Sequence, residues 1–198
     1  MSITLVAGLG NPGREYAETR HNFGWIVVEA LAAAEGLSWK REPAFDAEIA
    51  RWDRPDRRLL LVKPLTFMNE SGRSLAALAN YFRLASNRLA IVYDDLNLQL
   101  GTLKISERGT AGGHNGVASL LQHVGDGFVR FRLGIGPKFP AEMDLKDFVL
   151  GRFTPEQRSL VNQQLPSILA GLRLLIDNGA ARAMNSLNRR APNESDQS

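Results

Sequence analysis

A strand, a glycine-rich loop and a helix follow one another at the start of the chain. The apolar run Ile3 to Ala7 is typical of a buried strand. The stretch Gly8 to Gly24 then reads GLGNPGREYAETRHNFG, where the glycines permit backbone conformations closed to other residues and Pro12 fixes one dihedral angle. A helical pattern begins near Asn22 and stops at Gly36. A strand that leads into a helix in this way favours an α/β fold, and loops of this kind often form active sites.

The rest of the chain continues the alternation of strands and helices. Short apolar or alternating runs predict strands, and apolar residues at helical spacing predict helices. The expected strands are 3–7, 47–52, 59–62, 89–93, 101–107 and 128–135. The expected helices are 22–35, 70–83, 115–124, a long helix capped by Thr154 with a kink at Pro166, and 180–187.

This order predicts one three-layer α/β domain over residues 1–190, with a twisted mixed, largely parallel sheet between helices. The hairpin through Asp53 to Arg58 and a strand pair around Gly101 would supply the antiparallel part of the sheet. Residues 191–198 are expected to form a disordered tail.

Composition excludes several classes of protein. The 198 residues include no cysteine, which excludes disulfides, thiol catalysis and thiolate metal sites. No signal-like segment and no apolar stretch of about 20 residues is present, so we expect a cytoplasmic protein that does not span a membrane. The net charge is +3, and most of the basic residues are arginine. This balance fits a polyanionic partner and an ordinary solvated surface equally well.

Hydrolytic chemistry in this chain would depend on activated water. The sequence has no Gly-x-Ser-x-Gly elbow and no Walker loop, and its three histidines lack the His-Glu-x-x-His spacing of a metal site. His21, at a loop-to-helix junction, is either a catalytic base or a helix cap. Asp94 and Asp95 follow a short apolar strand, and only one of two adjacent side chains can face His21. Either carboxylate could instead cap a turn.

Three polar loops are expected to meet beyond the carboxyl ends of the strands, namely 8–22, 94–97 and 109–115. Their neighbours include three asparagines that are either ligand-binding or turn residues: Asn11, Asn69 and Asn115. Gly109 to Gly116 is not a dinucleotide fingerprint, although its N–H groups could hold an anion at a helix start. Within it His114 could stack on a base or begin the helix, whereas His123 is interpreted as structural.

Four motifs, in this order, resemble those of bacterial peptidyl-tRNA hydrolase: GLGNPG with TRHN (8–22), KPLTFMNESG (63–72), DDLNL (94–98) and GGHNG (112–116). The resemblance runs from about Ile3 to Arg190. It implies a monomeric α/β enzyme that hydrolyses the ester between a peptide and the terminal ribose of tRNA, without a cofactor or metal. A non-catalytic RNA-binding protein on the same scaffold is the main alternative, and a generic esterase is a third.

The resemblance also implies residue roles. His21 would be the general base that acts on water, Asp94 its orienting partner, and Asn11 a group that polarises the ester carbonyl or positions the water. Substrate would be held by Asn69 and Asn115 on the peptide main chain and tRNA end, by Met68 as the floor, and by Tyr16 and His114 as walls. The tRNA phosphates would contact Lys104, Arg108 and Arg132. Lys138 to Leu150 is interpreted as a lid.

The chain departs from the family pattern at three positions. Asn97 and Gln99 stand where the family often has Asp and Pro, and Ser106 stands near where a second basic residue is common. Asn97 and Gln99 argue against a charge-dependent role of their turn, and Ser106 predicts a weaker or shifted phosphate-binding patch. They do not touch the pair formed by His21 and Asp94.

Overall fold

The computed structural model describes residues 2–188 of the chain. Within them seven strands form one sheet in the order β2-β3-β4-β1-β5-β7-β6. The strands are β1 (Leu5–Gly8), β2 (Trp39–Glu42), β3 (Ala47–Asp53), β4 (Arg58–Pro64), β5 (Leu89–Gln99), β6 (Leu103–Ser106) and β7 (Val129–Gly136). The helices are α1 (Phe23–Ala34), α2 (Ser71–Tyr81), α3 (Asn115–His123), α4 (Leu145–Leu150), α5 (Pro155–Asn178) and α6 (Ala180–Leu187).

The sheet is mixed and its centre is parallel. Strands β4, β1, β5 and β7 run in the same direction, while β2 and β3 at one edge and β6 at the other are antiparallel to their neighbours. The predicted hairpin is confirmed, since Asp53 of β3 pairs with Arg58 of β4. The strand pair expected around Gly101 is arranged differently. Strand β6, which follows Gly101, does not pair with the preceding strand β5 but pairs with β7 at the edge of the sheet.

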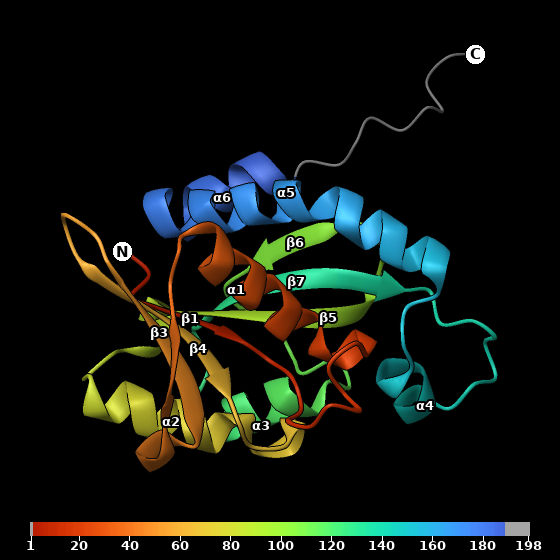
Figure 1. Ribbon diagram of the computed structural model, residues 1–198, viewed down its shortest axis with the longest axis horizontal. Helices are drawn as coiled ribbons and strands as arrows, with labels where there is room; N and C mark the ends of the chain where they lie inside the picture. The colour runs from red at the N-terminus through yellow and green to blue at the C-terminus, as the bar shows by residue number, and fades with distance from the viewer. Residues whose placement is uncertain (1, 189–198) are drawn as a thin grey trace.

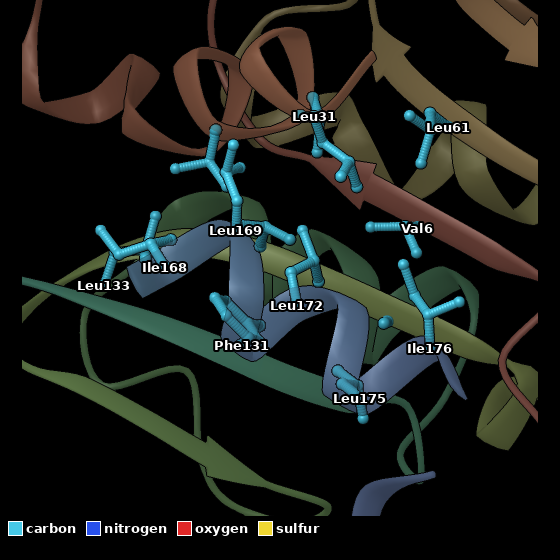
Figure 2. Packing of buried hydrophobic residues seen from close by; sticks show 14 of the residues in the cluster. Val6, Leu31, Leu61, Phe131, Leu133, Ile168, Leu169, Leu172, Leu175 and Ile176 are labelled. Atoms are coloured by element: carbon cyan, nitrogen blue, oxygen red, sulfur yellow. The ribbon is translucent and has the colours of Figure 1, made fainter. Parts of the chain in front are cut away.

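Helices cover both faces of the sheet, which confirms the three-layer prediction. Helices α1, α5 and α6 lie over one face, and α2 and α3 over the other (Figure 1). Side chains alternate between the two cores along β1, β4 and β5, so that Val6 of β1 joins the first core and Leu5 the second. In the first core, Leu172 and Ile176 of α5 pack toward the sheet (Figure 2). The central strands are therefore fixed on both sides.

The long helix α5 begins as predicted. Thr154 Oγ1 accepts from the Gln157 N–H, and Gln157 Oε1 accepts from the Thr154 N–H, which together form a capping box. The helix runs on through Pro166 to Asn178. None of the helices within residues 2–188 is long and apolar enough to cross a membrane.

Two elements were not predicted. Strand β2 has the charged sequence WKRE, which carries no apolar alternation, and it forms because β3 offers it a partner edge. Helix α4 is a short helix capped by the Asp144 side chain, inside the segment interpreted as a lid. Strand β5 also continues well past Tyr93, to Gln99. The predicted tail at 191–198 lies outside the described residues.

Candidate active site

His21 and Asp94 meet beyond the carboxyl end of the central strands. His21 lies in a 3-10 turn (Arg20–Asn22) between β1 and α1, and Asp94 lies on β5, the neighbour of β1. Nδ1 of His21 is 3.0 Å from Oδ2 and 3.1 Å from Oδ1 of Asp94. Both residues are buried, with exposed fractions of 8% and 2%. Asp95 turns away from His21 and accepts from Arg132 Nε at 2.6 Å.

Asp94 has a second histidine partner. Nε2 of His114 lies 3.0 Å from Oδ1 of Asp94. Nδ1 of His114 accepts from the N–H groups of Gly116 and Val117, because His114 is the N-cap of α3. Since Nδ1 is occupied as an acceptor, Nε2 carries the proton and donates it to Asp94. The carboxylate is thus held between two imidazoles.

The electrostatics of this cluster favour a charged Asp94. Burial alone would raise the pKa of Asp94, but the two imidazoles overcome that effect and lower it strongly. Burial likewise lowers the pKa of His21, yet the charge and hydrogen bond of Asp94 outweigh it and raise that pKa above 6.5. With Nδ1–H directed to Asp94, the Nε2 atom of His21 is left as a proton acceptor.

The same three side chains are the group within residues 2–188 that could be considered for a metal ion, because their ligand atoms lie within 4.8 Å of one another. Their chemistry does not fit that use. Nε2 of His114 carries a proton and donates it to Asp94, so this nitrogen could bind a metal ion only after losing that proton. Nδ1 of His114 already accepts from backbone N–H groups. The cluster is a buried carboxylate that is hydrogen-bonded to two imidazoles.

Asn11 is held in one orientation by its neighbours. The Met68 N–H donates to Oδ1 of Asn11 at 2.8 Å, which identifies the other side-chain atom as the amide Nδ2. The buried side chain of Asn22 accepts from the Asn11 N–H and donates to the Asn11 carbonyl. Nδ2 of Asn11 has no hydrogen-bond partner within residues 2–188, so it is free to donate to a ligand in the pocket.

A pocket of about 850 Å³ opens over this cluster. Nine of the predicted site residues line it: Asn11, His21, Met68, Asn69, Asp94, Arg108, His114, Asn115 and Arg132. Helix α4 forms part of its wall through Leu145, Val149 and Leu150. This volume is within the range of small-molecule sites, and the lining includes the cationic side chains of Arg108 and Arg132, which suit an anionic substrate.

Two of the predicted site residues lie outside the pocket lining. Tyr16 is half-buried in the turn before His21, where its carbonyl oxygen accepts from Thr19. Lys104 is exposed on β6, directly opposite Arg132 of β7. Their parts in substrate binding remain predictions.

Comparison with known proteins decides the family. The family model described as peptidyl-tRNA hydrolase matches residues 5–195 of the chain. The chain belongs to the peptidyl-tRNA hydrolase family. Among curated relatives, the peptidyl-tRNA hydrolase of Gloeobacter violaceus is 41% identical over 196 residues, and 96% of each chain is covered. That of Chloroflexus aggregans is 42% identical, with coverage of 93% of this chain and 98% of the relative.

Solved structures of the family have the same fold. The peptidyl-tRNA hydrolase of Acinetobacter baumannii superposes with a TM-score of 0.88 at 35% identity, and 96% of each chain is covered. A structure of peptidyl-tRNA hydrolase in complex with N-propanol gives the same TM-score at 34% identity. The predicted family and the predicted mixed, mostly parallel α/β sheet are thereby confirmed.

Several contacts in this family member could not be found from sequence patterns. Arg130 of β7 is 2% exposed and donates to the carbonyl oxygens of Gly109 and Thr110. It thereby fixes the loop that precedes α3. Asn22 and His114 each belong to a family motif, but the motif does not predict that Asn22 binds the backbone of Asn11 or that His114 binds Asp94.

Proposed function

We propose that this protein hydrolyses the ester bond between peptide and tRNA in peptidyl-tRNA, releasing free peptide and recyclable tRNA. The observation that carries the proposal is the pairing of His21 with Asp94, at the base of a polar pocket, in a chain of the peptidyl-tRNA hydrolase family. That pairing equips the pocket to activate water, which an RNA-binding module does not need. The enzyme is proposed to act as a cytoplasmic monomer without a cofactor.

In the proposed mechanism His21 is the general base. Asp94 holds the Nδ1–H of His21, so that Nε2 faces a water molecule and removes its proton as the oxygen attacks the ester carbonyl. The imidazolium that forms is stabilised by the adjacent carboxylate. His21 then returns the proton to the ribose oxygen as the ester bond breaks.

Asn11 is proposed to stabilise the charge on the carbonyl oxygen. The Met68 N–H fixes the amide orientation, and the free Nδ2 can then donate to that oxygen or to the attacking water. Met68 would form the floor beneath the ester. Because Asn11 is held through both its backbone and its side chain, it needs little rearrangement during the reaction.

The substrate is proposed to extend in two directions from the ester. Asn69 and Asn115 would bind the peptide main chain and the tRNA end, with His114 and Tyr16 as walls. The tRNA phosphates would contact Lys104, Arg108 and Arg132. Arg132 is already paired with Asp95 at 2.6 Å, which partly neutralises it, so the exposed Lys104 is the freer cation of this pair.

Replacing Lys104 with Ala should weaken tRNA binding and reduce its dependence on salt. One lost phosphate contact lowers the slope of log K against log salt concentration by up to about one unit. The measurement is a binding titration at several salt concentrations. Lys40→Ala is the matched control, because Lys40 is an exposed lysine on β2 at the opposite edge of the sheet. Equal slopes for wild type, Lys104→Ala and Lys40→Ala would place the tRNA elsewhere.

The function itself is tested by incubating the purified protein with peptidyl-tRNA that carries a labelled peptide, in the presence of a chelator. We expect release of free peptide and intact tRNA at the same rate with and without chelator. His21→Ala protein, purified from the same host in parallel, controls for a contaminating hydrolase. Binding of peptidyl-tRNA without release by the wild-type protein would contradict the proposal and favour a non-catalytic RNA-binding protein.

A further inference from the structure

Arg20, the residue before His21, is a charged side chain that is buried. Only 8% of it is exposed, and burial lowers the pKa of its guanidinium. Its Nη1 donates to the carbonyl oxygen of Phe148 at 3.1 Å, and its Nη2 donates to Oε1 of Gln157 at 2.8 Å. Phe148 belongs to α4 and Gln157 to the capping box of α5. One side chain therefore joins the turn before α1 to two consecutive helices more than a hundred residues further along the chain.

Aromatic rings complete the surroundings of Arg20. The guanidinium carbon lies 4.5 Å from the centre of the Phe148 ring and 5.6 Å from that of Phe153. Phe153 in turn packs edge-on against Phe23, the first residue of α1, with a centroid distance of 5.4 Å. Burying a cation is costly unless its partners compensate for the lost water. Two acceptors between aromatic rings suit the planar guanidinium of arginine, which can donate to both acceptors at once.

The backbone of the same turn is attached to the end of α4. The Arg20 N–H donates to the Gly151 carbonyl oxygen at 3.0 Å, and Thr19 forms an isolated bridge with Arg152. Phe148 is the buried residue of α4, and both its ring and its carbonyl group contact Arg20. The position of α4 relative to His21 therefore depends largely on Arg20.

Helix α4 matters because it walls the pocket. Leu145, Val149 and Leu150 line the cavity above His21, and Phe148, from the same short helix, is held by Arg20. The segment before α4 is exposed and includes Phe139, 84% of which is accessible. A six-residue helix beside such a segment has little stability of its own, so its tertiary contacts must hold it.

We propose that Arg20 is a positioning residue that fixes α4 as a wall of the substrate pocket at a set place relative to His21. The inference deepens the proposed function and rests on it for its kinetic part. Arg20 acts through α4, so it should control how well substrate is held more than how fast the proton is transferred. This separates it from His21 and Asp94, which act on the reacting atoms.

The test compares Arg20→Met and Arg20→Lys with wild type. Met keeps the apolar stem and removes both donors, whereas Lys keeps the charge and can supply a donor to Phe148 but cannot span both partners. Arg152→Met is the matched control, since Arg152 is 65% exposed in its side chain and pairs with Glu18 on the surface. The readouts are hydrogen exchange of the backbone amides of α4, measured without substrate, and the separate kcat and KM for peptide release.

For Arg20→Met we expect faster exchange in α4 with β1 and β5 unchanged, a KM raised on the order of tenfold, and a kcat within about threefold of wild type. Arg20→Lys should lie between wild type and Arg20→Met both in the exchange rate of α4 and in KM. It also provides the test if Arg20→Met does not fold. Arg152→Met should match wild type. The pH dependence of the rate should not move in any of these variants, because Asp94 still holds His21.

Wild-type exchange in α4 together with wild-type KM in both Arg20 variants would overturn the proposal. So would a fall in kcat at unchanged KM, which would place Arg20 in the chemical step. If the wild-type protein released no peptide, the proposed function would fail, whereas the exchange measurement would still test whether Arg20 holds α4.

Discussion

Replacing His21 with Ala is expected to lower the single-turnover rate of peptide release by about 10² to 10⁴, the usual contribution of a general base. Of the two imidazoles that contact Asp94 within residues 2–188, only that of His21 has a free nitrogen that can face water, because His114 has its Nδ1 engaged with backbone N–H groups. Removing it leaves the pocket and its arginine side chains in place. Binding of tRNA should therefore be retained while turnover is lost.

His123→Ala is the control for this experiment. His123 lies at the end of α3, where its Nδ1 contacts the Ser119 carbonyl oxygen, and it does not line the pocket. Its variant should keep the wild-type rate. Near-normal activity in His21→Ala, in a protein whose thermal unfolding matches wild type, would exclude His21 as the base.

Replacing Asp94 with Asn is expected to reduce the rate by roughly 10² or more, toward the loss of about 10⁴ recorded for the equivalent change in a serine protease. The reason lies in His114. Its Nε2 can only donate, so the amide oxygen of an asparagine must take the place of Oδ1, which His114 and His21 share, and the amide N–H groups must take the place of Oδ2, the atom 3.0 Å from Nδ1 of His21. An amide N–H beside Nδ1 disfavours a proton there and favours the tautomer that carries it on Nε2, the atom that has to accept one from water.

Asp95→Asn is the matched control for Asp94→Asn. Asp95 is the adjacent carboxylate, but it contacts Arg132 and the Asn97 N–H and not His21. We expect a mild loss of rate and some change in tRNA binding, since Arg132 is released. Single-turnover release should be measured for both variants beside their thermal unfolding. A larger catalytic loss at Asp95 than at Asp94, with both folds intact, would mean that the orienting carboxylate has been misassigned.

The pairing of His21 with Asp94 could be anticipated from sequence because simple topology brings the two together. Asp94 lies on a buried parallel strand and His21 in the segment that leaves the neighbouring strand β1, so the two approach each other at the same edge of the sheet. The choice of Asp94 over Asp95 came from the family motif, and the alternation of side chains along β5 agrees with it. The capping box at Thr154 could also be predicted from sequence, since it depends on two residues only three positions apart.

Other contacts depend on distances between segments that no local pattern encodes. Arg20 reaches Phe148 and Gln157 across more than a hundred residues, and the pairing of Arg132 with Asp95 depends on the register of β7 against β5. Strand β2 is similar, because its charged residues extend only when β3 is beside them. The family motifs therefore located the proposed catalytic pair, but neither they nor short-range patterns located the residues that hold the pocket around it.

The pH dependence of the single-turnover rate, compared between wild type and Asp94→Asn, tests the central claim most directly. A base works only when neutral, so the rate should fall as the pH drops through the pKa of His21, which Asp94 raises above 6.5. Removing the negative charge of Asp94 removes the causes of that rise, and burial then lowers the pKa. We predict that the acidic limb of Asp94→Asn lies at lower pH than that of wild type, with a lower plateau. A limb at the same or higher pH in the variant would contradict the assignment of Asp94 and His21 as the catalytic pair.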